Sequence, residues 1–184
     1  MNSPLPRINP IDFSRLPSPL AHSLQSYQKG ERTFDQFVRT LADAPVILEA
    51  YLAFSDALDR SALPETVRRK IAIAVSELNS SEYDLAAHAE KARELGLSEE
   101  EIQLCRQATS SSRKDEALLR FAQNLVGKQG HLSETELEEA RQYSDDDQLL
   151  VEAIATVAQV HFANLINNLS RPPLDAPAPS ELQD

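Results

Sequence analysis

Residues 68–88 read RRKIAIAVSELNSSEYDLAAH, and the interpretation of the whole chain depends on this stretch. Its apolar side chains, with one that precedes it, recur at steps of three and four residues: Val67, Ile71, Ala74, Val75 and Leu78. This is the spacing of one helix face, and Ile73 adds a second apolar edge. The pattern predicts a core helix over residues 64–78 that is buried on more than one side, with Pro64 in its first turn.

The second half of the stretch predicts another helix, which begins at Ser81 and ends at Gly96. Ser81, Asp84 and His88 then lie at i, i+3 and i+7 on one face. Asp84 and His88 are i, i+4 neighbours, and a carboxylate beside an imidazole orients the ring and favours its protonated form. Such a pair suits a general acid or base.

Structural explanations compete with this interpretation. Ser81 and Asp84 form an S-x-x-D pattern at a helix start, which is a capping-box arrangement worth about 1 kcal/mol. His88 could be a core histidine with one satisfied hydrogen bond. A Ser81 nucleophile activated by His88 is disfavoured, because seven helical residues separate them by about 10 Å along the axis.

The stretch resembles the core motif of the alkylhydroperoxidase D-like (AhpD-like) proteins of the carboxymuconolactone decarboxylase superfamily. The thiol branch of that family reads N-x-C-x-Y-C-x-x-A-H, which Asn79, Tyr83, Ala87 and His88 match. Ser81 and Asp84 stand where the two cysteines would be, and Arg69 where that branch carries a glutamate. Further segments resemble the family in order, at residues 39–55, 96–102, 132–137 and 164–177.

The resemblance implies an all-α, single-domain AhpD-like helical bundle over residues 20–171. It also implies a homo-oligomer, either a trimer or a hexamer, and a possible small-molecule ligand. By the same resemblance, the candidate catalytic residues are His88, Asp84, Ser81 and Tyr83.

The function that the resemblance favours is non-redox. The cysteine-free decarboxylase branch has a carboxylate four residues before the histidine, as Asp84 is before His88, and acts on a lactone-bearing diacid. An anionic substrate also needs a cation, which Arg68, Arg69 or Lys70 could supply. Two alternatives stay open: a catalytically silent binding or assembly protein, and a peroxidase-related antioxidant that works by another route.

The composition of the chain limits the classes of partner that we expect. The chain has 184 residues, with 29 acidic and 18 basic side chains and a formal net charge of -11, and its Lys and Arg residues form no stripe. We therefore expect neither nucleic acid nor an anionic membrane as a partner. The N-terminus lacks a signal-peptide pattern and no apolar run approaches the roughly 20 residues of a membrane span, so we expect a cytoplasmic protein.

Outside the motif, the potentially reactive residues predict neither a cofactor site nor a metal site. The single cysteine, Cys105, has the spacing of a buried helix face, which favours an inert thiol over a one-cysteine peroxidase. The four histidines are widely spaced. His161, with the asparagines near it, favours hydrogen bonding between helices or subunits over ligand contact. Tyr51, Phe54 and Leu58 favour a core stripe.

Proline and cap positions set the remaining organisation. Residues 1–19 contain five prolines and predict an extended arm, and residues 172–184 predict a non-helical tail. Serines at 98 and 133 predict helix N-caps, whereas residues 110–114 predict a linker. The remaining predicted helices cover residues 20–28, 33–42, 45–61, 115–127 and about 145–169, the second capped by Thr33.

Overall fold

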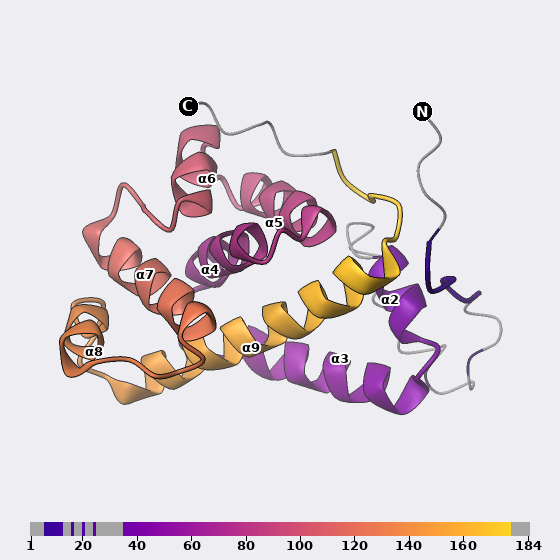
Figure 1. Cartoon of the computed structure of the whole chain (residues 1–184), viewed down its shortest axis with the longest axis horizontal. Coiled ribbons are helices and arrows are strands. Elements are labelled where there is room, and N and C mark those ends of the chain that lie inside the picture. Colours follow the sequence, from indigo (N-terminus) through magenta and orange to yellow (C-terminus); the bar gives the residue numbers. More distant parts are fainter. Residues whose placement is uncertain (1–5, 13–15, 17–19, 21–23, 25–34, 178–184) are drawn as a thin grey trace.

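The computed structural model describes residues 6–12, 16, 20, 24 and 35–177, and the described part of the chain contains helices and connecting loops without strands (Figure 1). Its helices are α2 (Asp35–Leu41), α3 (Pro45–Asp59), α4 (Glu65–Leu78), α5 (Glu82–Glu94), α6 (Glu99–Arg106), α7 (Arg113–Gly127), α8 (Glu134–Ala140) and α9 (Asp147–Ser170). The all-α prediction is confirmed. The predicted helix at 20–28 and its neighbour's cap at Thr33 lie largely outside the described residues.

Helix α4 is the centre of the bundle. It packs against α5, α6, α7 and α9, and Figure 1 shows it enclosed by these helices. Ile71, Ile73 and Val75 are completely buried although they do not share one helix face. The sequence prediction of a core helix buried on more than one side is therefore confirmed.

Helix α9 is the longest element, and it contacts α2, α3, α4, α5 and α7. By length and composition alone it is apolar enough to cross a membrane, contrary to the expectation from the sequence. In this fold, however, Ala153, Val157 and Val160 lie in the core that α4 dominates. The helix thus combines a buried side with other sides that face outward.

Local signals set most helix ends as predicted. The Ser98 hydroxyl accepts the Glu101 N–H, and Ser133 forms a complete capping box with Glu136. Gly96 follows α5 with φ +87°, a left-handed conformation that glycine adopts without a steric penalty. The predicted linker at 110–114 is wrong in part, because Ser112 caps α7 two residues earlier than expected.

Two hydrophobic clusters meet at α5. Its Leu85 and Ala89 belong to the larger cluster around α4, whereas Tyr83 and Ala87 belong to a smaller cluster with α2 and α3. Asp84 and His88 occupy the boundary between the clusters. The fold therefore places the two predicted chemical groups where two packed units adjoin.

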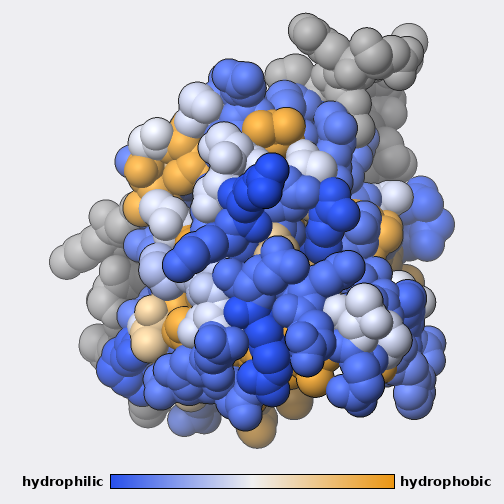
Figure 2. All heavy atoms as spheres, turned by 90° about the vertical axis from the view of Figure 1, so that its left-hand side faces the viewer, coloured by the Kyte–Doolittle hydropathy of each residue, from blue (hydrophilic) through white to orange (hydrophobic). Residues whose placement is uncertain are grey.

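Both terminal segments run over the chain's own surface where they are described. The Arg7 N–H donates to the Ser170 carbonyl at 2.7 Å, and the Ile11 N–H donates to the Arg39 carbonyl at 3.1 Å. Residues 171–177 are non-helical, as predicted. On another side, the face that carries α7 and α8 is mostly hydrophilic (Figure 2).

Candidate functional site

A pocket of about 580 Å³ opens between α3, α4, α5 and α9. It contains two of the four predicted catalytic residues, Asp84 and His88, together with Arg69 from α4. Its other walls include Phe37, Tyr51, Leu58, Thr156, Gln159, Val160 and Ala163. The sequence predicted that Tyr51, Phe54 and Leu58 form a stripe in the core. In the structure Tyr51 and Leu58 line the pocket, and Phe54 is 37% exposed.

His88 is buried on α5, with 6% of its surface exposed. Burial lowers its pKa to about 3, and the nearby positive charge of Arg69 acts in the same direction. The imidazole is therefore neutral at physiological pH. This is the opposite of the protonated ring expected beside a carboxylate, and it suits a base or a hydrogen-bonding group.

Asp84 is completely buried, and Ser81 and Asn167 donate hydrogen bonds to its carboxylate. Ser81 Oγ donates to Asp84 Oδ2 at 2.6 Å, and Asn167 Nδ2 lies 2.9 and 3.0 Å from the two carboxylate oxygens. Burial raises the pKa of Asp84, although these hydrogen bonds oppose the shift. The buried site therefore favours the neutral carboxylic acid form of Asp84 more strongly than aqueous solution does.

The capping-box interpretation of Ser81 and Asp84 is wrong. Ser81 occupies the N-cap position of α5, but its side chain makes no cap hydrogen bond. Its hydroxyl instead orients the Asp84 carboxylate, and only 1% of Ser81 is exposed. Ser81 does not line the pocket, so it acts on the site through Asp84.

Arg69 is the cation that the fold places in the pocket. Its guanidinium makes a long ion pair of 3.4 Å with Glu65, and its buried Nε has no hydrogen-bond partner among the described residues. Arg68 also lines the pocket but donates to the Leu63 carbonyl and to Asp59. Lys70 points elsewhere, toward Asp115 and Glu101.

Tyr83 lies outside the residues that line the pocket. Its hydroxyl donates to Asp175 in the C-terminal segment and accepts the Phe37 N–H at 3.1 Å. Burial and the Asp175 carboxylate raise the pKa of Tyr83, so the phenol stays protonated. The structure therefore connects Tyr83 to α2 and to the tail.

The asparagine-rich end of α9 forms hydrogen bonds between helices, as predicted. Asn79 Nδ2, at the end of α4, lies 2.8 Å from Asn164 Oδ1 and 3.0 Å from His161 Nδ1. Asn168 Nδ2 donates to the Asn79 carbonyl at 2.8 Å. Asn167, another of the asparagines near His161, donates to Asp84 of α5.

Among the described residues, neither a thiol nor a cluster of metal-binding side chains lies at this pocket. Cys105 is completely buried in the main core, and burial raises its pKa to about 12. The described residues contain no cluster of three His, Cys, Asp or Glu side chains that could hold a metal ion. The buried, inert thiol predicted from the sequence fits this environment.

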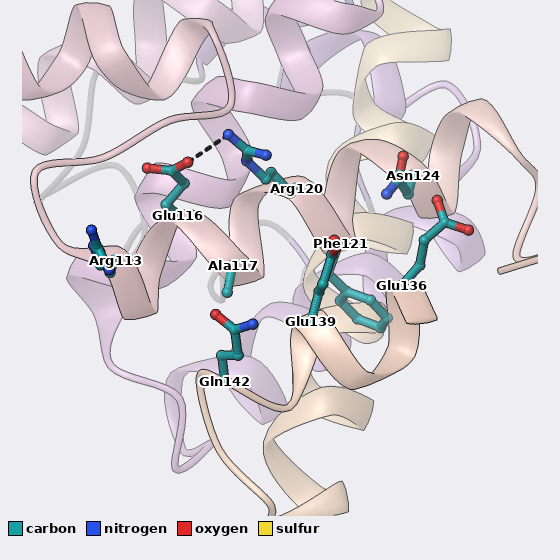
Figure 3. Close-up of a pocket in the computed structure, with 9 residues that line it drawn as sticks. All are labelled: Arg113, Glu116, Ala117, Arg120, Phe121, Asn124, Glu136, Glu139 and Gln142. Carbon is teal, nitrogen blue, oxygen red and sulfur yellow. Dashed lines mark ion pairs between the residues drawn. The ribbon is translucent and has the colours of Figure 1, made fainter. Parts of the chain in front are cut away.

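A second hollow, of about 460 Å³, lies between α7 and α8 (Figure 3). Arg113, Glu116 and Arg120 come from α7, and Arg120 pairs with Glu116 at 2.7 Å. Glu136 and Glu139 of α8 border the other side. None of the predicted catalytic residues lines it, so we place the candidate site at the larger pocket.

A family model and several solved structures are similar to this chain. The sequence model of the carboxymuconolactone decarboxylase family matches residues 45–123, which include α4, α5 and the pocket residues Arg69, Asp84 and His88. Among the curated proteins, none matches the chain.

Solved structures share the fold at low sequence identity. An AhpD-core, peroxidase-related protein from Ralstonia eutropha JMP134 is 20% identical with a TM-score of 0.79, covering 96% of this chain and 100% of its own. A peroxidase-related protein from Silicibacter sp. TM1040 is 18% identical with a TM-score of 0.77, covering 96% and 97%. A cysteine-to-alanine variant of the debrominase Bmp8, in complex with 2,3,4-tribromopyrrole, is 18% identical with a TM-score of 0.75, covering 95% and 92%. The family model thus covers the motif helices with their pocket residues, and the solved structures show that the chain shares their fold.

Proposed function

We propose that this protein is a non-redox enzyme that catalyses proton transfer to or from a small organic acid, in a decarboxylation or a similar reaction. The observation that carries the proposal is the meeting of Arg69, Asp84 and His88 in one pocket of about 580 Å³. A cation, a carboxyl group and a neutral imidazole at one cavity are the groups that such chemistry requires.

Arg69 binds the carboxylate of the substrate. Its Nε is buried without a partner among the described residues, and a buried N–H of this kind normally finds an acceptor. A carboxylate matches a guanidinium in charge and geometry. Binding an acid would therefore satisfy a donor that the described residues leave unpaired, in the pocket that His88 and Asp84 also line.

Asp84 and His88 supply the proton transfer. When the carbon–carbon bond of the substrate breaks, its electron pair moves to a neighbouring carbonyl and carbon dioxide leaves. The resulting enolate takes a proton from Asp84 in its carboxylic acid form, which burial favours by raising the pKa, and Asp84 then recovers a proton from solvent. Neutral His88 is available as the base for a substrate that must first lose a proton.

One observation favours a second candidate, a silent binding protein. Both oxygens of Asp84 accept hydrogen bonds from Ser81 and Asn167, which fix the carboxyl group as part of the packing between α5 and α9. A chain that kept the pocket and lost the chemistry would have this arrangement. Such a protein would bind a small ligand without turnover.

Turnover of a panel of small carboxylic acids tests the proposal. The panel should include lactone-bearing diacids, and a ring compound such as tribromopyrrole, because the similar debrominase structure contains that ligand. Carbon dioxide release and thermal shifts would be measured together. For a substrate found in this way, we expect His88→Gln and Asp84→Asn to lower kcat at least about 100-fold, and Arg69→Met to raise KM.

Arg120→Met, which changes an exposed arginine at the other hollow, is the matched control and should behave as wild type. Unchanged turnover in His88→Gln and Asp84→Asn would contradict the proposal. Ligand binding without turnover by any panel member would favour the silent binding protein.

Peroxide reduction is the third possibility, and a thiol-coupled assay with an alkyl hydroperoxide separates it from the others. Cys105 lies outside the pocket with a raised pKa, so we expect no activity in wild type or in Cys105→Ala. A Ser81→Cys/Asp84→Cys variant would restore the two thiols of the family motif and should gain activity. Wild-type turnover that Cys105→Ala abolishes would place the chemistry at Cys105.

A further inference from the structure

The candidate pocket carries acidic groups at its opening. Asp59 and Glu65 line the pocket with side chains that are 67% and 40% exposed, and Asp56, which lines it too, is also exposed. We call these three carboxylates the acidic mouth. The Arg69 side chain lies deeper, with 20% of its surface exposed. An anionic ligand therefore meets three negative charges on its way to the guanidinium of Arg69.

Of the two arginines that line the pocket, only Arg69 has a donor without a partner among the described residues. Arg68 donates to the Leu63 carbonyl at 2.7 Å and to Asp59 at 3.1 Å, so its guanidinium is already engaged. Arg69 contacts Glu65 at a long 3.4 Å, and its buried Nε has no hydrogen-bond partner in the described part of the chain. The pocket thus offers one place for one carboxylate.

Much of the remaining wall is aromatic or aliphatic. The rings of Phe37 and Tyr51 meet edge to face, with centroids 5.0 Å apart and an angle of 70° between their planes. The polar side chains of Gln159 and Ser55 are hydrogen-bonded to each other at 2.7 Å. The buried aliphatic residues of the wall are Leu58, Leu63, Ala72, Val160 and Ala163. Such a wall suits an apolar ring, and the pocket volume lies in the range of about 300–1,000 Å³ that is usual for small organic ligands.

A second carboxylate on the ligand has no favourable position in this pocket. Against the aliphatic and aromatic wall it would lose its hydration without gaining a hydrogen bond. At the opening it would face the acidic mouth, whose three carboxylates already outnumber the two arginines of the pocket. Both positions therefore penalise a dianion relative to a monoanion with the same body.

We propose that the pocket selects monocarboxylic acids with an apolar ring over dicarboxylic acids of the same shape, and that Glu65 is a specificity-determining residue. The inference rests on the proposed function, because it assigns the substrate class of the same site. Glu65 acts in two ways. Its carboxylate pairs with Arg69 and so competes with the carboxylate of the ligand, and its charge repels a second carboxylate at the opening.

Isothermal titration calorimetry on the full chain tests the selectivity with 2-naphthoate and naphthalene-2,6-dicarboxylate, which share one ring system and differ by one carboxylate. Wild type should bind 2-naphthoate, and at low salt it should bind the dicarboxylate at least about 10-fold more weakly. Arg69→Met should weaken the binding of 2-naphthoate at least about 10-fold. Glu65→Gln should tighten the binding of both acids, and the ratio of their Kd values should fall at least about threefold.

Glu134→Gln is the matched control, because Glu65 and Glu134 are both acidic residues in the first turn of a helix and Glu134 lies outside the pocket. This variant should keep the wild-type ratio of Kd values. Equal binding of the two acids by wild type, an unchanged ratio in Glu65→Gln, or the same fall in the ratio in Glu134→Gln would overturn the proposal. Binding of neither acid would overturn it as well.

Carbon dioxide release from ring-bearing acids separates this proposal from the proposed function. Selective binding of 2-naphthoate without turnover of any monocarboxylic acid would reject the proposed catalysis and support the selectivity. Turnover of a dicarboxylic acid with a higher kcat/KM than the matching monocarboxylic acid would support the proposed catalysis and overturn the selectivity.

Discussion

Asp84 is the residue whose environment conflicts most with its ordinary chemistry. It is completely buried and accepts hydrogen bonds from the neutral groups of Ser81 and Asn167. Burial raises its pKa above the usual 3.8. Its contribution to stability is therefore complete below that value and is lost as the pH rises through the folded pKa, because the folded state then holds a buried charge.

We predict that Asp84→Asn stabilises the protein at pH 7, by about 1 kcal/mol or more. The amide keeps the shape of the side chain without the charge, and it offers a donor to Asn167 Oδ1, which is buried without a partner among the described residues. The gain should shrink as the pH falls toward 4. Urea unfolding followed by circular dichroism at several pH values measures it.

The exposed carboxylate of Asp43 provides the matched control, since Asp43→Asn changes the same groups at the surface. Its free energy of unfolding should follow the wild-type pH dependence. A lower stability of Asp84→Asn at pH 7 would show that the ionised carboxylate contributes to folding. If Asp84→Asn is more stable than wild type but loses turnover, the Asp84 carboxyl group is retained for function at a cost in stability.

At the scale of helices, a buried ionic cluster joins α4 to α6 and α7. Lys70 Nζ lies 2.7 Å from Glu101 and 2.6 Å from Asp115, and both Lys70 and Glu101 are 8% exposed. Burial by itself lowers the pKa of Lys70, but the hydrogen bonds and charges of Asp115 and Glu101 outweigh it and raise the pKa. The lysine therefore remains charged and holds two carboxylates inside the bundle.

We predict that Lys70→Met lowers the free energy of unfolding by roughly 3–5 kcal/mol, because it leaves the buried carboxylate of Glu101 and the half-buried one of Asp115 without their cation. Arg120→Met, which breaks the exposed pair with Glu116, should cost less than about 1 kcal/mol. Urea titration of both variants measures the difference. Equal losses in the two variants would mean that burial does not strengthen the Lys70 cluster.

At the scale of the whole molecule, Tyr83 connects segments that are distant in sequence. Its hydroxyl contacts Asp175 beyond α9 and the Phe37 backbone in α2, and the Gln36 N–H also donates to Asp175. The C-terminal segment is thereby fastened across α5 and α2. This contact closes the smaller hydrophobic cluster, in which Tyr83 is buried.

We predict that Tyr83→Phe destabilises the fold by about 2 kcal/mol, because a hydrogen bond to a carboxylate is lost and a buried N–H loses its acceptor. Turnover per folded molecule should not change. Tyr143→Phe is the control, with an expected effect under about 0.5 kcal/mol. Reduced turnover with unchanged stability would instead give Tyr83 the catalytic role inferred from the family motif.

The sequence by itself determined the helical class, most helix ends and the central position of α4. These properties follow from local causes: apolar spacing along one helix, serine caps and a glycine beyond the end of α5. The placement of Asp84 and His88 on α5 was also predictable, since it requires only helical periodicity. The first turn of α7 was missed because a run of serines has the composition of a loop and of a cap alike.

Only the tertiary structure decided what these residues do together. Asp84 is held by Asn167 from α9, 83 positions away, and Arg69 rather than Lys70 reaches the pocket because the two adjacent side chains leave α4 in different directions. The neutral state of His88 and the raised pKa of Asp84 both follow from burial, which depends on the packing of distant helices. Helical periodicity predicts which side chains share a face, but hydrogen-bond partners and desolvation arise only when separate elements pack.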